Sequence, residues 1–170
     1  PLPDLRVTAI NAPQEALAGQ VVPLSWTVAN QGQGGLRAAG WVDRIYLSLD
    51  GGTSNSIHVG DFRYEGALAA GTSVTRTQNI TLPADLTGNY TVVVITDYNN
   101  ENYEYAGEEN NRSIDDRPIA TAFPPLPDLQ VTSITPPTDA FSSTSTVVSW
   151  VVTNTGNGAS SAARWVDTVV

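Results

Sequence analysis

An internal repeat constrains this chain more than any other feature of its sequence. Residues 1–10 recur as residues 125–134, at an offset of about 124 positions. The match continues without gaps, and nearly half of the overlapping positions are identical. The other matching pairs of segments are 24–30 with 148–154 and 41–43 with 165–167. Chance does not produce such agreement, so the sequence predicts two copies of one module.

The repeat also predicts the domain organisation. We expect residues 1–122 to form one complete module, residues 123–127 a proline-rich, semi-rigid linker, and residues 128–170 the first strands of a second copy. A module of about 124 residues can bury enough surface to fold alone, whereas a stretch of about 46 cannot. Because the chain begins at Pro1 without a methionine, we expect it to be a segment of a longer protein.

The pattern of apolar residues predicts an all-β fold. Segments rich in Val, Ile, Thr and Tyr alternate with turns rich in Gly, Pro and Asn, which is typical of an immunoglobulin-like or fibronectin-III-like β-sandwich. About seven strands are predicted, over residues 5–10, 20–30, 40–49, 57–65, 73–82, 90–97 and 113–120. In the turn at residues 30–34, we expect Gly32 and Gly34 to supply positive φ angles.

Composition excludes several classes of function. The net charge is −9 and every basic residue is an arginine, without a dense patch that could neutralise phosphates, so we expect no nucleic-acid partner. The chain has no apolar run of roughly 18 residues, so we expect no membrane insertion in this segment. Cysteine is absent, which rules out disulfides and thiolate metal sites. With a single histidine, His58, and no nucleophile motif, the chain is predicted not to be an enzyme.

An acidic segment between two predicted strands is the main candidate site. Carboxylates alternate with asparagines over residues 97–111 and offer the hard oxygen ligands that calcium prefers. The candidate ligands are Asp97, Asn99, Glu104, Glu108 and Asn110. The alternative is a solvated acidic turn whose asparagines satisfy backbone groups.

Asp43 is a second candidate, because strand alternation places it on the same face as the apolar residues Trp41 and Ile45. A carboxylate on such a face needs a partner. It either sits at the rim of the strand and accepts backbone hydrogen bonds, or it reaches a cation. We therefore include Asp43 among the candidate metal ligands, and Asp167 occupies the same position in the second copy.

Several motifs, taken in order, resemble the CARDB family, the cell-adhesion-related domain of bacteria. The matching segments are 3–5 (Pro-Asp-Leu), 26–32, 41–50, 88–90 (Gly-Asn-Tyr) and 97–111. The resemblance implies an immunoglobulin-like sandwich in secreted or cell-surface proteins of prokaryotes, often arranged in tandem.

The sequence leaves three functional hypotheses. The first is an extracellular tandem-repeat stalk or adhesive array, stiffened by calcium in the acidic segment. The second is a subunit of an extracellular filament, completed by strand pairing with neighbouring copies. The third is a carbohydrate-binding accessory domain, for which Tyr98, Tyr103 and Tyr105 are the candidate aromatic cluster. The expected partners are thus neighbouring copies, with cell-surface or glycan ligands as further candidates.

Overall fold

The computed structural model describes residues 1–36, 40–162 and 164–170. The chain divides into two compact units, Pro1–Phe123 and Pro124–Val170. The first unit contains two β-sheets, and the second contains one sheet of two strands.

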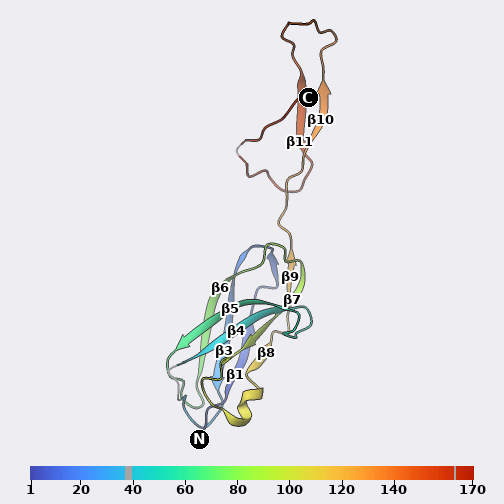
Figure 1. Ribbon diagram of the computed structural model, residues 1–170. Coiled ribbons are helices and arrows are strands. Elements are labelled where there is room, and N and C mark those ends of the chain that lie inside the picture. Colours follow the sequence, from blue (N-terminus) through green and yellow to red (C-terminus); the bar gives the residue numbers. More distant parts are fainter. Residues whose placement is uncertain (37–39, 163) are drawn as a thin grey trace. The chain divides into compact units, whose positions relative to one another are not determined.

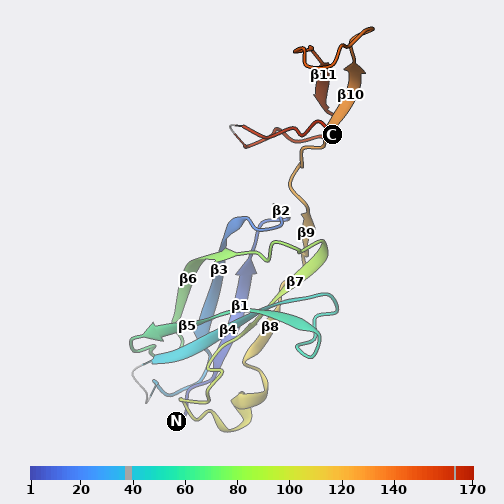
Figure 2. The same ribbon diagram turned by 45° about the horizontal axis from the view of Figure 1, so that its top comes forward.

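The first unit is a sandwich (Figure 1, Figure 2). Its smaller sheet has the antiparallel order β1-β3-β6. These strands are β1 (Leu5–Asn11), β3 (Val21–Asn30) and β6 (Ser73–Thr81). The larger sheet has the order β2-β9-β7-β4-β5, with β8 paired to β7. Its strands are β2 (Glu15–Leu17), β4 (Gly40–Ser48), β5 (Ser56–Glu65), β7 (Gly88–Ile95), β8 (Arg112–Ile114) and β9 (Ile119–Ala122).

The predicted all-β sandwich is confirmed, with one predicted strand divided in two. The segment predicted as 113–120 forms β8 and β9, separated by a turn in which Asp115 Oδ1 accepts a hydrogen bond from the Arg117 amide at 3.1 Å. Pro118 follows, and it has no amide hydrogen with which to continue a strand ladder. Sequence periodicity did not reveal the short edge strand β2, which pairs in parallel with β9, or the 3₁₀ helix η1 (Tyr105–Glu109).

The core lies between the two sheets and follows the alternation of the strands. Leu24, Trp26 and Val28 of β3 are fully or almost fully buried, as their spacing predicts. Strand β7 lies between β9 and β4, and its residues Val92 and Val93 are buried although they point to opposite faces. A central strand covered on both faces has this pattern.

Gly32 and Gly34 are required for a reason other than the predicted one. Neither has a positive φ angle; instead, the N-terminal segment lies directly on their turn. A Cβ atom at Gly32 would lie 2.4 Å from the Leu2 carbonyl oxygen, and one at Gly34 would lie 2.4 Å from the Pro1 carbonyl oxygen. The glycines therefore allow two backbone segments to approach closely, and the expectation of positive φ was wrong.

The second unit repeats the first hairpin of the sandwich. Strands β10 (Leu129–Thr135) and β11 (Ser149–Asn154) pair Leu129 with Asn154, as β1 and β3 pair Leu5 with Asn30. Both hairpins have a register shift at the same relative position. Within this unit the Leu126 amide donates to Asn157 Oδ1 at 3.1 Å, so part of the predicted linker is already bound to the second unit.

Among the described residues the one helical element is η1, which has 5 residues and is drawn as a coiled ribbon in Figure 1. Across residues 1–36, 40–162 and 164–170, no helix has the length and apolar character that a membrane span requires.

Candidate functional site

The acidic loop, residues 96–111, connects β7 to β8 and begins with a tight turn at Asp97. Asp97 and Asn100 have positive φ angles of 44° and 52°, which Asp and Asn tolerate better than most residues. The buried Asp97 carboxylate accepts hydrogen bonds from the amides of Glu101 (2.9 Å) and Asn102 (2.8 Å). Burial raises the pKa of the Asp97 carboxyl group. Both Asp97 oxygens thus hold the backbone of the loop in place.

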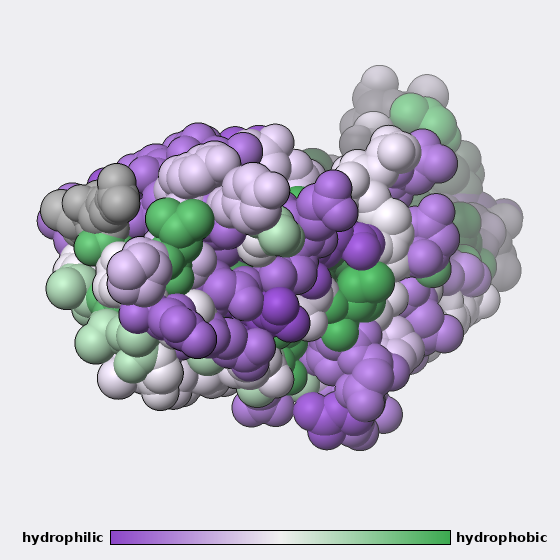
Figure 3. All heavy atoms as spheres, turned by 90° about the horizontal axis from the view of Figure 1, so that it is seen from below, coloured by the Kyte–Doolittle hydropathy of each residue, from purple (hydrophilic) through white to green (hydrophobic). Residues whose placement is uncertain are grey.

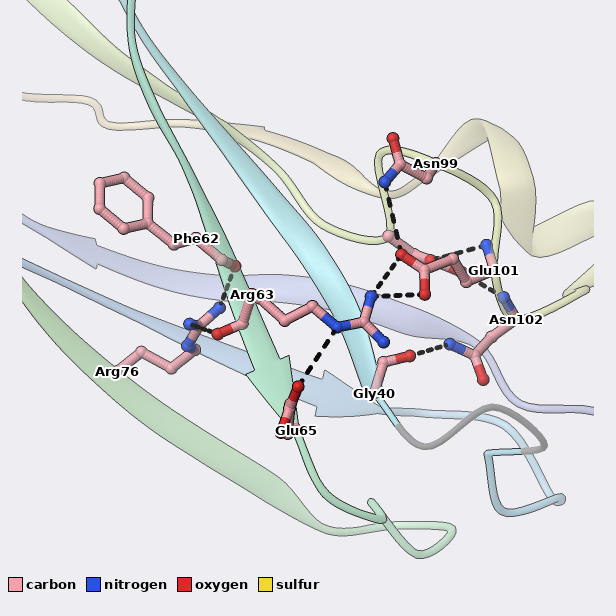
Figure 4. A network of polar contacts seen from close by, with 9 residues as sticks. Gly40, Phe62, Arg63, Glu65, Arg76, Asn99, Glu101 and Asn102 are labelled. Atoms are coloured by element: carbon pink, nitrogen blue, oxygen red, sulfur yellow. Dashed lines mark hydrogen bonds and ion pairs between the residues drawn. The ribbon is translucent and has the colours of Figure 1, made fainter.

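Polar contacts fasten this turn to the larger sheet, as Figure 4 shows. Asn102 Nδ2 donates to the Gly40 carbonyl oxygen at 2.9 Å, at the start of β4. Arg63 Nη1 of β5 contacts both carboxylate oxygens of Glu101, at 2.7 and 2.5 Å, and Arg63 lowers the pKa of that carboxyl group. The exposed Asn99 side chain donates only a long hydrogen bond of 3.4 Å to Glu101. Asn99 therefore belongs to this surface contact and not to the buried part of the loop.

Glu104 is the most buried carboxylate in the second half of the loop, with 4% of its surface exposed. Its Oε2 atom accepts a hydrogen bond from the Leu5 amide at 2.8 Å. Glu108 lies one turn further along η1, and its Oε1 atom accepts a hydrogen bond from the Glu104 amide at 2.8 Å. Asn110 Nδ2 donates to Asp4 Oδ1 at 3.0 Å. Three of the candidate ligands are therefore gathered between η1 and the start of β1.

Each of these three residues has a buried oxygen that lacks a hydrogen-bond partner in the described part of the chain. The atoms are Glu104 Oε1, Glu108 Oε2 and Asn110 Oδ1. Leaving such a group unsatisfied costs about 1–3 kcal/mol, and more for a charged group. Carboxylate and amide oxygens are the donors that Ca²⁺ prefers, so the residues present fit a hard divalent cation. Among the described residues, however, no three His, Cys, Asp or Glu side chains are already arranged to hold a metal ion.

The electrostatics of Glu104 agree with this picture. The pKa of Glu104 is raised to about 7, mainly by burial and also by the nearby carboxylates of Asp97, Glu108 and Asp4, while the hydrogen bond from the Leu5 amide opposes the shift. A cluster of like charges in a buried position favours either a proton or a cation. Near neutral pH a large fraction of this carboxyl group is thus protonated.

Asp4 is a member of this cluster that sequence reasoning missed. Its carboxylate accepts hydrogen bonds from Arg6 Nε at 3.2 Å and from the side-chain Nδ2 of Asn110. A Cβ atom at the buried Gly107 would lie 3.1 Å from Asp4 Oδ1, so the glycine makes room for this approach. The available signal was the repeat itself, since the Pro-Asp-Leu motif of residues 3–5 returns at 127–129.

The site opens to the surface through a hollow lined by residues from the N-terminal segment and from η1, including Asp4, Glu104, Tyr105 and Asn110. Figure 3 looks onto the end of the first unit that carries η1 and the N-terminus, and hydrophilic residues cover most of its centre. The hollow is thus lined by charged and polar side chains together with the apolar residues Leu2, Pro3 and Ala106.

Asp43 lies apart from the acidic loop, in the core between the two sheets. It is fully buried, with Oδ2 accepting from Trp26 Nε1 and Oδ1 from Trp41 Nε1, both at 2.7 Å. Arg76 Nη1 forms an ion pair with the same carboxylate and donates to the carbonyl oxygen of Phe62 at 2.9 Å. The partners of Asp43 are thus two indole N–H groups and a guanidinium group, whereas the sequence had suggested either backbone amides at a strand rim or a metal ion. We call Trp26, Trp41, Asp43 and Arg76 the inter-sheet tie, because they join β3 and β6 to β4.

The structure therefore separates the predicted ligands into three groups. Glu104, Glu108 and Asn110 lie together, and Asp97 adjoins them through charge and through the loop backbone. Asn99 is on the surface, and Asp43 is in the core with partners that come from outside the acidic loop.

Comparison with known proteins identifies the family. The CARDB family model matches residues 2–114, which end at the last residue of β8. The chain belongs to the CARDB family. This is a non-catalytic domain family, presumed to be related to adhesion and associated with extracellular and cell-surface proteins. No curated protein sequence matches the chain significantly.

A solved CARDB structure shares the fold. The crystal structure of a CARDB domain from Pyrococcus furiosus in complex with di-metal ions is 21% identical, with a TM-score of 0.53 over 71% of this chain and 90% of that chain. The solution structure of a CARDB domain from the same organism is 19% identical, with a TM-score of 0.49 over 72% and 98%. A superoxide reductase (neelaredoxin) from Ignicoccus hospitalis is 18% identical, with a TM-score of 0.37 over 67% and 79%. At 21% identity, the similarity to the crystal structure of the CARDB domain concerns the fold alone.

The three tyrosines of the CARDB module's acidic loop have different settings. The Arg44 guanidinium lies over the ring of Tyr98, 3.6 Å from its centroid, so one face of that ring is covered. Tyr103 and Tyr105 are 61% and 72% exposed. Tyr98 is 37% exposed, so most of the exposed aromatic surface of the loop belongs to Tyr103 and Tyr105.

Proposed function

We propose that this chain is part of an extracellular, non-catalytic array of tandem CARDB modules that acts as a stalk or adhesive segment on a prokaryotic cell, and that calcium bound in the acidic loop stiffens each complete module. The observation that carries the proposal is the set of buried, unpartnered oxygens on Glu104, Glu108 and Asn110.

The tandem arrangement is supported by the agreement between the two units. Besides the common register of the hairpins, the Trp150 indole donates to Asp167 Oδ2 at 2.9 Å, as Trp26 donates to Asp43. Gly156 and Gly158 approach the backbone of the segment 125–127 as closely as Gly32 and Gly34 approach residues 1–3. Sequence identity and local geometry therefore both repeat at the same offset.

The cation is supported by the chemistry of the donors and by the related structure. Glu104, Glu108 and Asn110 would supply oxygen ligands, with Asp97 holding the loop and contributing negative charge. The Pyrococcus furiosus CARDB domain was crystallised with di-metal ions. Calcium accepts six to eight oxygens in flexible geometry, whereas magnesium requires a tighter octahedron, so a loop built of irregular backbone suits calcium better.

Bound calcium would stabilise the folded module by relieving two costs at once. It would neutralise the repulsion that Asp97, Glu108 and Asp4 exert on Glu104, and it would satisfy the unpartnered oxygens. The gain in free energy of unfolding equals RT ln(1 + [Ca²⁺]/Kd), or about 2.7 kcal/mol at a hundredfold excess over Kd.

Thermal unfolding of the full chain tests the proposal. Addition of calcium after treatment with a chelator should raise the melting temperature of the first module by roughly 10 °C at saturation. Glu104→Gln should abolish the increase, whereas Glu109→Gln, which changes an exposed carboxylate of the same helix, should preserve it. A melting temperature that is indifferent to chelator and to calcium would refute the calcium site.

A filament is the second candidate function, favoured by the exposed apolar side chains of the second unit. Ile134, Val151 and Trp165 are 65%, 52% and 53% exposed. Apolar surface of this kind is covered in most soluble proteins, and a neighbouring copy could cover it by strand pairing. Electron microscopy and sedimentation of the purified chain distinguish the two functions, because a filament subunit should assemble as its concentration rises, whereas a stalk segment should not.

A further inference from the structure

The acidic loop holds the first residues of β1 through contacts that span most of the module. The Leu5 amide donates to Glu104 Oε2 at 2.8 Å, across 99 positions of sequence, and Asn110 Nδ2 donates to Asp4 Oδ1 at 3.0 Å, across 106 positions. With its amide nitrogen turned toward acceptors, Asn111 also donates to the Leu5 carbonyl oxygen at 2.9 Å. The backbone of β1 is therefore attached to the loop where the strand begins.

Asp4 adds a negative charge near Glu104. Its carboxylate lies close enough to raise the pKa of Glu104, and it lines the same surface hollow as Glu104 and Asn110. Glu104 is more than nine-tenths buried, and its Oε1 atom has no partner among the described residues. Glu104 thus offers a buried, unpartnered carboxylate oxygen, and the Asp4 carboxylate of the N-terminal segment lines the same hollow, so a divalent cation could be bound by both.

We propose that Asp4 is a further ligand of the cation site, so that a bound divalent cation fastens the start of β1 to the acidic loop. This inference rests on the calcium site proposed above and adds its connection to the N-terminal segment. Among the described residues, β1 is the edge strand of its sheet and forms ladder hydrogen bonds with β3 alone. The cation thus acts as a lock on the strand that leads into the module.

The second unit provides a matched control inside the same chain. Asp128 repeats the local contacts of Asp4: its amide donates to Asn154 Oδ1 at 2.9 Å, as the Asp4 amide donates to Asn30 Oδ1 at 3.1 Å. The segment 128–170 contains no residues equivalent to the acidic loop, because at the offset of the repeat that loop would begin after Val170. Asp4 therefore has the acidic loop beside it, whereas Asp128 has no such loop within this chain.

Calorimetric titration with calcium and hydrogen exchange of the full chain test the lock. Asp4→Asn should weaken calcium binding by about tenfold or more, and Asp128→Asn should leave it unchanged. In the wild-type chain, calcium should slow exchange of the amides at the start of β1, above all that of Leu5, and leave the equivalent Leu129 amide unaffected. Asp4→Asn should remove this protection.

The outcomes separate the lock from the calcium site itself. If Glu104→Gln abolishes calcium binding while Asp4→Asn binds as tightly as wild type, the site exists and the lock is wrong. If the wild-type chain binds no calcium, both proposals fail. Should Asp4→Asn not fold, the wild-type exchange data still decide: equal effects of calcium on Leu5 and Leu129, or no effect on either, would overturn the lock.

Discussion

The hairpin of β1 and β3 and the hairpin of β10 and β11 have the same register but opposite exposure. Leu5 and Trp26 are 0% and 1% exposed, whereas their counterparts Leu129 and Trp150 are 40% and 39% exposed. The pairing of the strands is therefore specified by the hairpin and its turn, since it forms equally in both units. Burial is specified elsewhere, by the opposing sheet that β4, β5, β7 and β9 supply to the first unit.

The hydrogen bond between tryptophan and aspartate sharpens this comparison. It is present in both units, but the Asp43 carboxylate is completely buried and is neutralised by Arg76 of β6, a strand that the second unit lacks. The Trp150–Asp167 bond is exposed. The tryptophan–aspartate hydrogen bond thus forms without the rest of the module. Its contribution to the free energy of unfolding depends on burial and on Arg76, which comes later in the sequence.

We expect the largest change in stability when the carboxylate of the inter-sheet tie is removed. Asp43→Asn leaves the Arg76 guanidinium buried beside a neutral amide, which should lower the free energy of unfolding of the first module by about 3–5 kcal/mol. Asp167→Asn, at the equivalent exposed position, should leave unfolding unchanged within error. Urea denaturation of both variants, followed by circular dichroism, makes the measurement. Equal effects of the two substitutions would contradict the difference between the units.

A smaller effect is expected from pH, and it too should be confined to the first unit. In chelator, the pKa of Glu104 is about 7 in the folded chain against an ordinary value of 4.5. The folded state binds this proton more tightly, so its stabilising effect is complete below about pH 4.5 and is lost as pH rises through about 7. Glu104 alone should thereby cost roughly 3 kcal/mol at pH 8 relative to pH 4.5.

Melting temperatures in chelator between pH 4.5 and 8 check this expectation. Glu104→Gln should flatten the fall in stability with rising pH, and Glu109→Gln should not. A wild-type profile that superimposes on the Glu104→Gln profile would show that Glu104 is ordinary in solution. The difference between variants is the informative quantity, because Asp61 and Glu101 have lowered pKa values and act in the opposite direction at acidic pH.

We expect the smallest effect from replacing the exposed tryptophans, which should change the fluorescence of the chain and leave its stability unchanged. The chain has 4 tryptophans. Trp26 and Trp41 are buried, whereas Trp150 and Trp165 are 39% and 53% exposed. Iodide should therefore quench only part of the emission, and replacing Trp150 and Trp165 with Phe should leave emission that is shifted to the blue and protected from iodide. Complete protection of all tryptophans in the wild-type chain would mean that another copy covers the second unit.

The sequence was informative where short-range rules act. Two-residue alternation identified the buried face of β3, and the repeat predicted that the first strands of the module recur in the second unit. It was less informative where distant segments meet. Asp43 was recognised as a carboxylate on an apolar face, but its partner Arg76 lies 33 positions away on a strand of the other sheet.

The acidic loop shows the same limit. Its composition indicated a site, yet composition alone could not tell Asn99, which is exposed, from Asn110, which is half-buried. Nor could it show that Asp4 joins the loop from 106 positions away. The residue type determines what a side chain can bind, whereas the tertiary fold determines which side chains lie close together.

The inter-sheet tie has one further consequence. It joins the layers of the sandwich through a charge pair and two indole N–H groups in a chain that contains no thiol. Its formation transfers no electrons, and neither oxidant nor reductant can open or close it. Such a module can reach the same native state in a reducing cytoplasm as in an oxidising medium outside the cell, without a catalyst of disulfide exchange.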